Sequence, residues 1–489
     1  MNISDELKYR KLEQAQPGEF EQLQEKAKGC PWRQSYHIQA SAGLLNDPNG
    51  FTFYQGEYHL FYQWFPLGTF HGMKYWYHMK SSDLVHWEDV GVGIEPGDPQ
   101  DSHGAYSGSG IVKDDKLYLM YTGNTRDEQG ERHPFQNLAV MDSTGKIKKR
   151  SRPVIKAVPK GYTEHYRDPK IWFSGGKYFC VIGAQRANET GCAVLYSSSD
   201  LEAWDFEGEI ATSLGDFGYM WECPDYFEMD QQGVLLFSPQ GISPEGDHYR
   251  NIYQSGYIVG KPLDTERRSF VHGSFQELDR GFDFYAQQTT AAPDGRRILV
   301  AWMGLPDTNY PTDSNGWANC LTLPREITLR EGKMIQQPVR ELQMLRKQEV
   351  KFESTLQDEV NTFEGFSGTS YELICEFSGA NAERFGIEFR TGETEKTVLL
   401  YDRVEKEVIL DRSESGQPVA TEYGTERRCS LDADNIKFQL FVDSSSVEIF
   451  VNDGEEVFTS RIFPSMNSTG IRFFAQGGSA ACKATVWSI

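Results

Sequence analysis

Short apolar runs recur along the first two thirds of the chain at nearly even intervals. Five runs of five to seven residues are rich in aromatic and branched side chains and are bounded by Gly, Pro, Asn or Asp. They centre on Tyr62, Tyr121, Ile182, Phe237 and Ala301, and successive centres lie 59, 61, 55 and 64 residues apart. Such runs predict strands rather than helices. Evenly spaced strands occur in many large all-β proteins, but five units with this period favour a five-bladed β-propeller.

The pattern changes after about residue 330. Pro338 can open a short connecting helix, and beyond residue 350 the apolar runs become alternating hairpins, one of which turns at Asn452-Asp453-Gly454. This alternation indicates a smaller β-sandwich. We therefore predict an all-β chain with an N-terminal extension (1–30), a propeller (31–330), a linker (331–349) and a C-terminal β-sandwich (350–489).

Composition and charge exclude several classes of protein. The 489 residues carry a formal net charge of −22, which argues against a nucleic-acid or anionic-membrane partner. The charged N-terminus has no apolar signal core, and no run approaches the roughly 18 apolar residues of a membrane span. The eight cysteines are scattered singly, so we expect reduced thiols and a cytoplasmic protein. Homo-oligomer formation is left open.

Three acidic residues occupy the same phase of the repeat. Asp47, Asp168 and Glu222 are each followed closely by proline, which stiffens the local backbone. They lie 15, 14 and 15 residues before the centre of the next apolar run. Equivalent positions of different blades converge around the propeller axis. We therefore expect the three carboxyl groups to face one cavity.

Three carboxyl groups in one cavity suit glycoside hydrolysis. They cannot all ionise freely, so at least one should have a raised pKa and be available as an acid. One carboxylate can then attack the anomeric carbon or activate water, a second can protonate the leaving oxygen, and the third can orient hydroxyls. Asp-Pro and Asn-Gly steps are also ordinary turn formers. Neither a calcium loop, a zinc ligand set nor a nucleotide P-loop is found.

Polar and aromatic side chains near the acids are candidates for binding a sugar. The same phase of the second and fifth repeats contains Tyr106, Ser107 and Tyr285. Rings stack on sugar faces and amides bind hydroxyls, although a single Trp in a β-protein more often lies in the core. Further candidates of this kind are Gln63, Trp64, Tyr75, Trp76, Trp221 and Trp302.

The motifs around these residues resemble those of glycoside hydrolase family 32. The segments LLNDPNG (44–50), FYQWFP (61–66), YSGSG (106–110), YRDPK (166–170) and WECPD (221–225) carry the resemblance, together with SSSVEIFVNDGEEVFTSRIFP (444–464). The resemblance spans nearly the whole chain. It implies a five-bladed propeller with a C-terminal β-sandwich, and hydrolysis of terminal β-D-fructofuranosyl bonds with retention of configuration.

The resemblance also implies residue roles. Asp47 would be the nucleophile, Glu222 the general acid and base, and Asp168 the stabiliser of the transition state. Sugar contacts are implied for Asn46, Gln63, Trp76, Tyr106, Ser107 and Arg167, beside the candidates Tyr285 and Trp302. No metal or organic cofactor is expected. Within the family the chain is most similar to the branch that cleaves sucrose-6-phosphate into glucose-6-phosphate and fructose.

A phosphorylated substrate requires a local cationic site in so acidic a chain. His71 stands where secreted relatives commonly have Trp, and Lys74 follows closely. We predict a phosphate site formed by His71, Lys74 or Arg126, with Arg132 and His133 as further candidates. The alternatives are an intracellular hydrolase of unphosphorylated sucrose or short fructo-oligosaccharides, a non-catalytic carbohydrate-binding protein, and a sialidase-like propeller, for which the motifs supply no arginine cluster.

Overall fold

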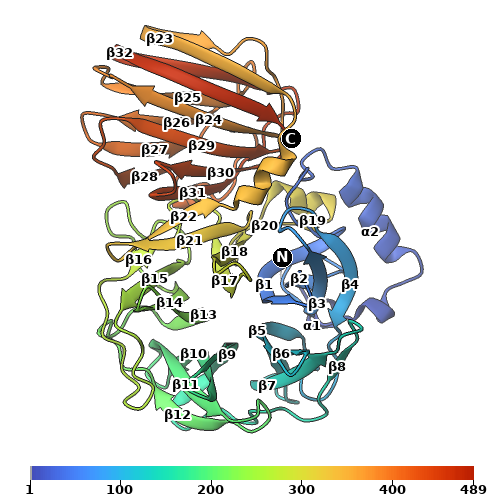
Figure 1. Ribbon diagram of the computed structural model, residues 1–489. Helices are drawn as coiled ribbons and strands as arrows, with labels where there is room; N and C mark the ends of the chain where they lie inside the picture. The colour runs from blue at the N-terminus through green and yellow to red at the C-terminus, as the bar shows by residue number, and fades with distance from the viewer. Residues whose placement is uncertain (1–2) are drawn as a thin grey trace.

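The computed structural model describes residues 3–489 and consists of a ring of five sheets with a β-sandwich beside it (Figure 1). Each sheet of the ring forms one blade, and its first strand lies nearest the axis. The first blade is built from β1 (Gly43–Tyr54), β2 (Glu57–Phe65), β3 (Tyr75–Ser81) and β4 (Glu88–Ile94). The second contains β5 (Ala105–Lys113), β6 (Lys116–Arg126), β7 (Arg132–Met141) and β8 (Ile147–Lys149).

The other three blades repeat this order. The third comprises β9 (Tyr162–Ser174), β10 (Lys177–Arg186), β11 (Gly191–Ser198) and β12 (Asp205–Glu209). The fourth comprises β13 (Met220–Met229), β14 (Gln232–Gln240), β15 (Gly256–Gly260) and β16 (Gln276–Glu277). The fifth comprises β17 (Tyr285–Ala291), β18 (Arg297–Met303), β21 (Arg325–Arg330) and β22 (Lys333–Pro338).

The apolar repeat of the sequence corresponds to one strand of each blade. The five runs form β2, β6, β10, β14 and β18, the second strands of their sheets. These strands are buried over most of their length because neighbouring blades pack on both of their faces. A strand buried on both faces contains a continuous apolar run rather than an alternating one. The prediction of a five-bladed all-β propeller is therefore confirmed.

Two short strands close the ring. β19 (Trp317–Ala318) pairs in parallel with the start of β1, where Gly43 lies opposite Trp317. β20 (Cys320–Leu321) pairs with β18 of the fifth blade. A 3-10 helix, η2 (Pro311–Asn315), precedes them. The last blade is thus hydrogen-bonded to the first, which fixes the diameter of the axial channel.

The N-terminal extension is helical and lies against the first blade. It contains α1 (Asp5–Lys8), η1 (Leu12–Gln14) and α2 (Glu19–Lys28). The backbone N–H of Met73 donates to the Lys8 carbonyl over 2.7 Å, and that of Leu12 donates to the Tyr75 hydroxyl over 2.9 Å. These contacts hold the extension against the segment that leads into β3.

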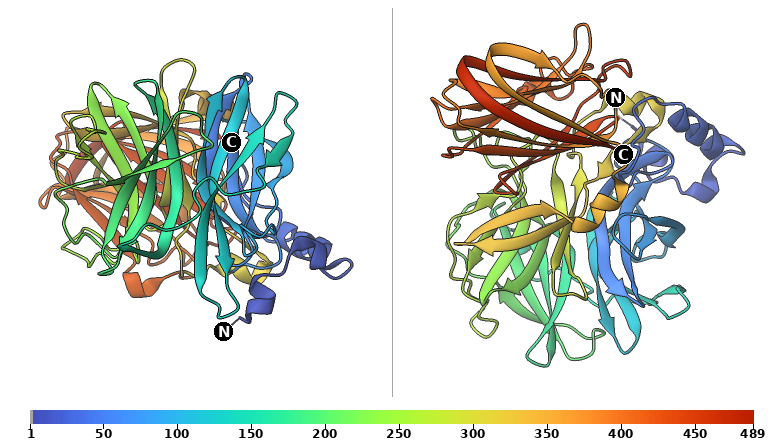
Figure 2. Two further views of the ribbon diagram at one scale, coloured as in Figure 1. Left: turned by 90° about the horizontal axis from the view of Figure 1, so that it is seen from below. Right: turned by 45° about the horizontal axis from the view of Figure 1, so that its top comes forward.

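The C-terminal part is a β-sandwich, as predicted, and two further views show it beside the ring (Figure 2). The long strand β32 (Gly470–Ser488) pairs with β25 (Arg384–Thr391) through its first half and with β24 (Tyr371–Ser378) through its second. Between the halves, Gly477 and Gly478 have φ of 69° and 143°, which permits the bend. The remaining elements are β23 (Glu349–Thr362), β26 (Thr397–Asp402), β27 (Glu407–Asp411), η4 (Thr421–Tyr423), β28 (Glu426–Ser430), β29 (Ile436–Asp443), β30 (Ser446–Val451) and β31 (Glu456–Arg461).

The connection between the two parts begins later than the expected linker at 331–349. β22 is hydrogen-bonded to β21 along its whole length and so belongs to the fifth blade up to Pro338. The predicted short helix follows as the 3-10 helix η3 (Arg340–Leu345), with Leu342 buried. The difference arises because β22 has only two adjacent apolar residues, Met334 and Ile335, between polar ones, so the sequence shows neither a continuous apolar run nor an alternation there.

Buried charged residues hold the sandwich against the ring. Arg325 of β21 is 0% exposed and donates to Glu448 of β30 over 2.6 Å and to Asp279 over 3.1 Å. His37 bridges Asp443 and Glu448 from the N-terminal side, with distances of 2.8 and 3.1 Å. We call His37, Asp279, Arg325, Asp443 and Glu448 the interface network.

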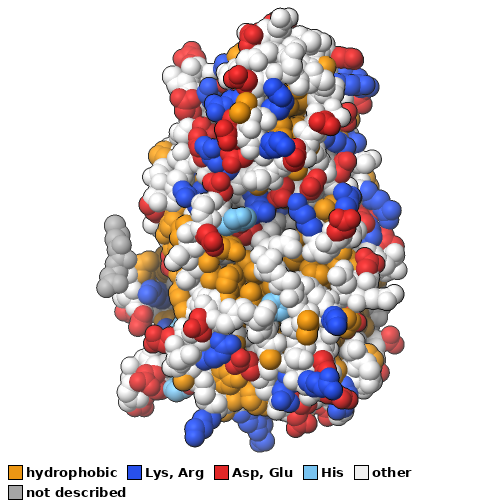
Figure 3. Space-filling model, turned by 90° about the vertical axis from the view of Figure 1, so that its left-hand side faces the viewer, with side chains coloured by type: hydrophobic (Ala, Val, Ile, Leu, Met, Phe, Trp, Pro, Cys, Tyr) orange, Lys and Arg blue, Asp and Glu red, His pale blue; other side chains and the backbone are white. Residues whose placement is uncertain are grey.

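Acidic and basic side chains are interspersed on the face of the molecule drawn in Figure 3. No basic patch dominates that face, in keeping with the acidic composition. Within residues 3–489, no helix has both the length and the apolar character needed to cross a bilayer.

Candidate active site

The innermost strand of every blade is interrupted at the same level by a β-bulge. The register shifts fall between Leu45 and Pro48, Ala105 and Gly108, Arg167 and Lys170, Glu222 and Asp225, and Tyr285 and Gln288. A bulge places an extra residue on one strand and redirects its side chains. Five bulges around one axis therefore bring at least one side chain of every blade to the same end of the axis.

The backbone at three of these bulges lies in the left-handed region. Asp168, Cys223 and Ala286 have φ of 68°, 48° and 52°. Non-glycine residues rarely adopt this conformation, and they cluster at functional sites. Proline follows Asp168 and Cys223 directly and restricts the chain at the point where it bends.

The bulges surround a cavity of about 230 Å³ that contains all three predicted acids. Among the predicted residues it is lined by Asn46, Asp47, Gln63, His71, Lys74, Tyr106, Arg132, Arg167, Asp168, Glu222, Tyr285 and Trp302. Its other lining residues are Gln240, Pro306 and Asp307. Gln240 could have been found in the sequence, because it is the polar end of the apolar run GVLLFSPQ. No comparable signal marks Pro306 or Asp307.

Asp47 is held by hydrogen bonds from three neighbours. Asn46 Nδ2 donates to Oδ1 over 3.1 Å, and Gln63 Nε2 donates to Oδ2 over 3.4 Å. The Ser107 hydroxyl also donates to Oδ2. Burial raises the pKa of Asp47, the hydrogen bond from Ser107 counteracts this, and the nearby charge of Glu222 raises it further. The carboxylate is thus fixed in direction and poorly solvated, as a nucleophile requires.

Glu222 accepts hydrogen bonds on both oxygens. Arg167 donates to Oε1 from Nε over 2.9 Å and from Nη2 over 2.6 Å. Gln240 Nε2 and the Tyr285 hydroxyl donate to Oε2 over 2.8 and 2.6 Å. Burial raises the pKa of Tyr285 well above its usual range, so its hydroxyl keeps its proton and remains a donor. Glu222 therefore occupies one fixed position across the cavity.

Asp168 is the least solvated of the three acids, with 6% of its surface exposed. Its Oδ2 accepts from the backbone N–H of Cys223 over 2.9 Å. Burial raises its pKa to about 7; Arg167 counteracts this, whereas the charges of Glu222 and Asp47 add to it. The expectation that at least one of the grouped acids has a raised pKa is met at Asp47 and Asp168.

The Cys223 thiol lies between two of the acids. Its Sγ is 3.7 Å from Asp47 Oδ2 and 3.7 Å from Asp168 Oδ2. Burial, with the neighbouring carboxylates, raises the pKa of this thiol well above its usual range. A neutral thiol therefore separates the two carboxylates and is a poor nucleophile itself.

Some predicted residues lie next to the cavity rather than in its wall. Ser107 is 3% exposed and reaches the site through Asp47. Trp76 is fully buried and donates from Nε1 to the Tyr106 carbonyl over 3.0 Å, so it supports that residue from behind. Three further aromatic candidates are core residues with at most 2% exposure: Trp64, Tyr75 and Trp221.

The cations predicted to bind phosphate are placed differently from one another. Lys74 is 2% exposed and donates to Asn46 Oδ1 over 2.7 Å, and burial lowers its pKa to about 7. His71 lines the cavity and packs edge-on against Trp302, with ring centres 5.9 Å apart. Arg126 lies outside the cavity wall and donates to the Tyr9 hydroxyl and the Gly130 carbonyl.

Arg132 lies opposite Arg126 on the paired strands β6 and β7 and does line the cavity. Its guanidinium carbon lies 5.9 Å from the centre of the Tyr106 ring. Within residues 3–489 its side chain makes no hydrogen bond or ion pair, and burial lowers its pKa. His133 instead pairs with Asp127 over 3.0 Å. Asp127, Glu131 and His133 are grouped as metal ligands can be, but they lie on the turn after β6 and at the start of β7, outside the cavity.

Comparison with known proteins agrees with this architecture. Residues 37–338 match the model of the glycosyl hydrolases family 32 N-terminal domain, and residues 341–488 match that of the family 32 C-terminal domain. The chain belongs to glycoside hydrolase family 32. The resemblance found in the sequence is therefore confirmed, and so are the fold and the assignment as a glycosidase.

Several family 32 relatives cover nearly the whole chain. A sucrose-6-phosphate hydrolase of Staphylococcus xylosus is 46% identical over 99% of this chain and 98% of its own length. One from Bacillus subtilis is 41% identical over 96% of this chain and 97% of its own. The solved sucrose-6-phosphate hydrolase of Lactobacillus gasseri superposes with a TM-score of 0.93 at 36% identity, covering 100% and 99% of the two chains. The solved family 32 beta-fructofuranosidase of Bombyx mori superposes with a TM-score of 0.84 at 32% identity, covering 98% of each chain.

Proposed function

We propose that this protein is a retaining β-fructofuranosidase that hydrolyses sucrose-6-phosphate to glucose-6-phosphate and fructose. The observation that carries the proposal is the fixed carboxylate of Asp47 in one cavity with Glu222 and Asp168. The names of its family relatives support the choice of sugar. A cytoplasmic location would suit a substrate that arrives in phosphorylated form.

The reaction then proceeds in two steps, formation and hydrolysis of a fructosyl ester. Asp47 attacks the anomeric carbon of the fructosyl unit while Glu222 gives a proton to the leaving glucosyl oxygen, so the glycosidic bond breaks and a fructosyl ester of Asp47 forms. Glu222 next removes a proton from water, which attacks the same carbon and frees Asp47. The Asp168 carboxylate stabilises the positive charge that develops on the ring, while Arg167 holds Glu222 in place.

The phosphate group requires a cation that is free to bind it. Arg167 is occupied by Glu222, Lys74 by Asn46, and Arg126 by Tyr9 and Gly130. Arg132 lines the same cavity with its guanidinium uncommitted among the described residues. A guanidinium can donate two parallel hydrogen bonds to a phosphate. We therefore assign the contact with the 6-phosphate to Arg132. His71, whose pKa burial lowers well below its usual value, lines the site as a neutral ring, and Lys74 is the nearby second cation.

The test compares kcat/KM on sucrose-6-phosphate, sucrose and 1-kestose for the wild type, Arg132→Gln and Arg126→Gln, with Asp47→Asn as the blank. Loss of one charge-assisted contact costs about 1.5–3 kcal/mol, or roughly 10- to 100-fold in kcat/KM. Arg132→Gln should lose this on the phosphorylated sugar alone. Arg126→Gln is the matched control, because its side chain starts from the facing position but does not line the cavity.

Other outcomes separate the remaining alternatives. Equal losses on all three sugars would remove Arg132 from phosphate binding but leave the hydrolysis in place. Parity of the wild type on the three sugars, or preference for 1-kestose, would indicate use of sucrose or fructo-oligosaccharides. Binding of sugar without turnover, unaffected by Glu222→Gln, would identify a carbohydrate-binding protein instead.

A further inference from the structure

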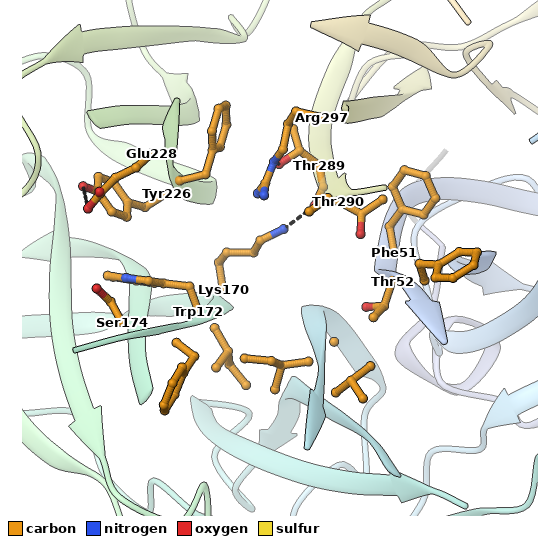
Figure 4. A pocket seen from close by; sticks show the side chains of 18 residues that line it. Phe51, Thr52, Lys170, Trp172, Ser174, Tyr226, Glu228, Thr289, Thr290 and Arg297 are labelled. Atoms are coloured by element: carbon orange, nitrogen blue, oxygen red, sulfur yellow. Dashed lines mark hydrogen bonds between the residues drawn. The ribbon is translucent and has the colours of Figure 1, made fainter. Parts of the chain in front are cut away.

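A second cavity, of about 390 Å³, opens at the other end of the propeller axis. It is lined by the C-terminal halves of all five innermost strands, whereas the acids lie on their N-terminal halves (Figure 4). We call it the distal cavity. A volume of this size falls in the range of about 300–1,000 Å³ that is typical of small-molecule sites.

The distal cavity is separate from the active site. Between the two lies a space of only about 10 Å³, bordered by Pro48, Gly108, Lys170, Asp225 and Gln288. Such a space holds about one water molecule and admits no sugar. A molecule bound in the distal cavity must therefore enter from the other face of the ring.

Two cations, Lys170 and Arg297, line this cavity, and the carboxylate of Asp225 lies behind them outside its wall. Lys170 is 6% exposed, and its Nζ donates to the Thr289 carbonyl over 2.7 Å (Figure 4). The same Nζ donates to Asp225 Oδ2 over 2.8 Å. Arg297 donates from Nε to the Thr289 hydroxyl over 2.9 Å, while its Nη2 remains 3.6 Å from Asp225 Oδ1. Within residues 3–489, the Nη atoms of Arg297 and Oδ1 of Asp225 have no hydrogen-bond partner.

The charges leave an uncompensated positive site beside Arg297. Asp225 can neutralise only one of the two cations. Glu228 also lines the cavity, but it is exposed and accepts from the Tyr226 hydroxyl. Burial lowers the pKa of Lys170 to about 8, with Asp225 opposing this and Arg297 lowering it further. An anion placed between the two cations would relieve this repulsion.

The walls are suited to an organic ligand. Trp172 and Phe173 line one side, and the Arg297 guanidinium lies 4.3 Å from the centre of the Phe227 ring, which holds it flat. Exposed Phe173, with 56% of its surface accessible, stands at the margin. An aromatic wall beside a planar guanidinium can accommodate a ring that bears an anionic group.

We propose that the distal cavity binds the phosphate group of a small molecule, with Arg297 supplying two parallel donors and Lys170 the second positive charge. The phosphate can be free or esterified to a sugar. This site is independent of the reaction proposed above, since the two cavities share no lining residue. The phosphate would bind near the propeller axis, at the end opposite to the three acids of the active site.

The probes are inorganic phosphate and glucose-6-phosphate, titrated calorimetrically into the wild type, Arg297→Gln and Lys177→Gln. Lys177 is the matched control, because it is an exposed cation at the start of β10, the strand that follows β9, and does not line the cavity. Arg297→Gln should weaken the distal site at least about 10-fold, whereas Lys177→Gln should leave it unchanged. Turnover of sucrose by Arg297→Gln shows whether that variant is folded.

Further measurements show where the phosphate binds and whether the ligand is free phosphate or a sugar phosphate. A crystal equilibrated with inorganic phosphate should show the anion at Arg297 and Lys170, and affinity should fall as the pH rises above about 8 and Lys170 loses its charge. Tighter binding of glucose-6-phosphate than of phosphate indicates a sugar phosphate as ligand, and equal binding indicates phosphate alone. Absence of binding at this position, or the same affinity in a folded Arg297→Gln variant, overturns the proposal.

Discussion

The molecule contains two sets of buried carboxylates that differ in how they are neutralised. In the interface network, Asp443 and Glu448 are fully buried, and each accepts hydrogen bonds from a cation. In the active site, Asp47 and Asp168 have neighbouring carboxylates, while Arg167 is directed at Glu222. Similar side chains at similar depth therefore experience opposite electrostatic environments.

The pKa values show this difference directly. Burial alone would raise the pKa of all four groups. At two carboxylates of the interface network, Asp443 and Glu448, His37 and Arg325 more than offset burial, so their pKa values are lowered. At the third, Asp279, burial outweighs Arg325 and the pKa is raised. At Asp47 and Asp168 the offset is incomplete and the pKa values are raised. The first set serves stability, whereas the second holds unfavourable charge that catalysis can use.

The largest expected effect is the loss of activity when a carboxylate of the active site is removed. Asp47→Asn keeps the shape and hydrogen-bonding capacity of the side chain but removes the nucleophile. We expect kcat to fall by roughly 10⁴-fold or more, with no loss of thermal stability. Steady-state kinetics and a melting curve on the same preparation measure both. A variant that keeps more than a few per cent of its activity would remove Asp47 from the nucleophilic role.

Removing a carboxylate from the interface network should instead reduce stability and leave activity unchanged. Glu448→Gln leaves Arg325 buried without its main partner, and breaking a buried pair in this way costs about 3–5 kcal/mol of unfolding free energy. At temperatures where the variant is folded, kcat/KM should be unchanged, because the residue does not line the cavity. Denaturant unfolding and kinetics at low temperature measure the two effects.

Glu455→Gln is the control for that experiment. Glu455 is partly exposed and lies 3.9 Å from Lys333, so its loss should cost at most about 1 kcal/mol. Equal losses in the two variants would contradict the special role of the interface network.

Much of this architecture could be predicted because the second strand of each blade is buried on both faces. That burial imposes the apolar runs from Tyr62 to Ala301, and the fixed distance from each run to the bulge places the acids. The regular spacing therefore predicts which residues face the propeller axis. The short closing strand β19 could not be found, because two residues show no periodicity.

The cationic residues were harder to place for a different physical reason. Arg126 and Arg132 occupy facing positions on β6 and β7, yet only Arg132 lines the cavity. Which side chain turns inward depends on register and on the partner Tyr9, more than 100 residues away in sequence. Lys74 likewise reads as a loop charge in the sequence but lies buried beside Asn46. Likewise, nothing in the motifs indicated the interface network.

A smaller effect is expected for the pH dependence of the interface. Burial would lower the pKa of His37, but Asp443 and Glu448 reverse this and raise it to about 9. The stability that protonated His37 adds to the folded protein is therefore complete below the unfolded pKa of about 6.5, and it is lost as the pH rises through about 9. His37→Gln should reduce the unfolding free energy by up to about 3 kcal/mol at pH 6. The difference from the wild type should shrink toward pH 10, and a pH-independent difference would contradict the charge argument.

The smallest expected effect is a gain in stability when an active-site carboxylate is removed. The folded-state pKa of Asp168 is raised to about 7, so ionising this group disfavours the folded protein as the pH rises from about 4 through 7. Asp168→Asn removes that cost. It should therefore increase the unfolding free energy by about 1–2 kcal/mol at pH 8 and leave it unchanged at pH 4, while kcat falls. Melting curves at the two pH values measure the gain, with Asp200→Asn on the exposed turn after β11 as the control. If Asp168→Asn destabilises the protein at pH 8, the active-site carboxylates are neutralised as well as those of the interface, and the distinction between the two sets fails.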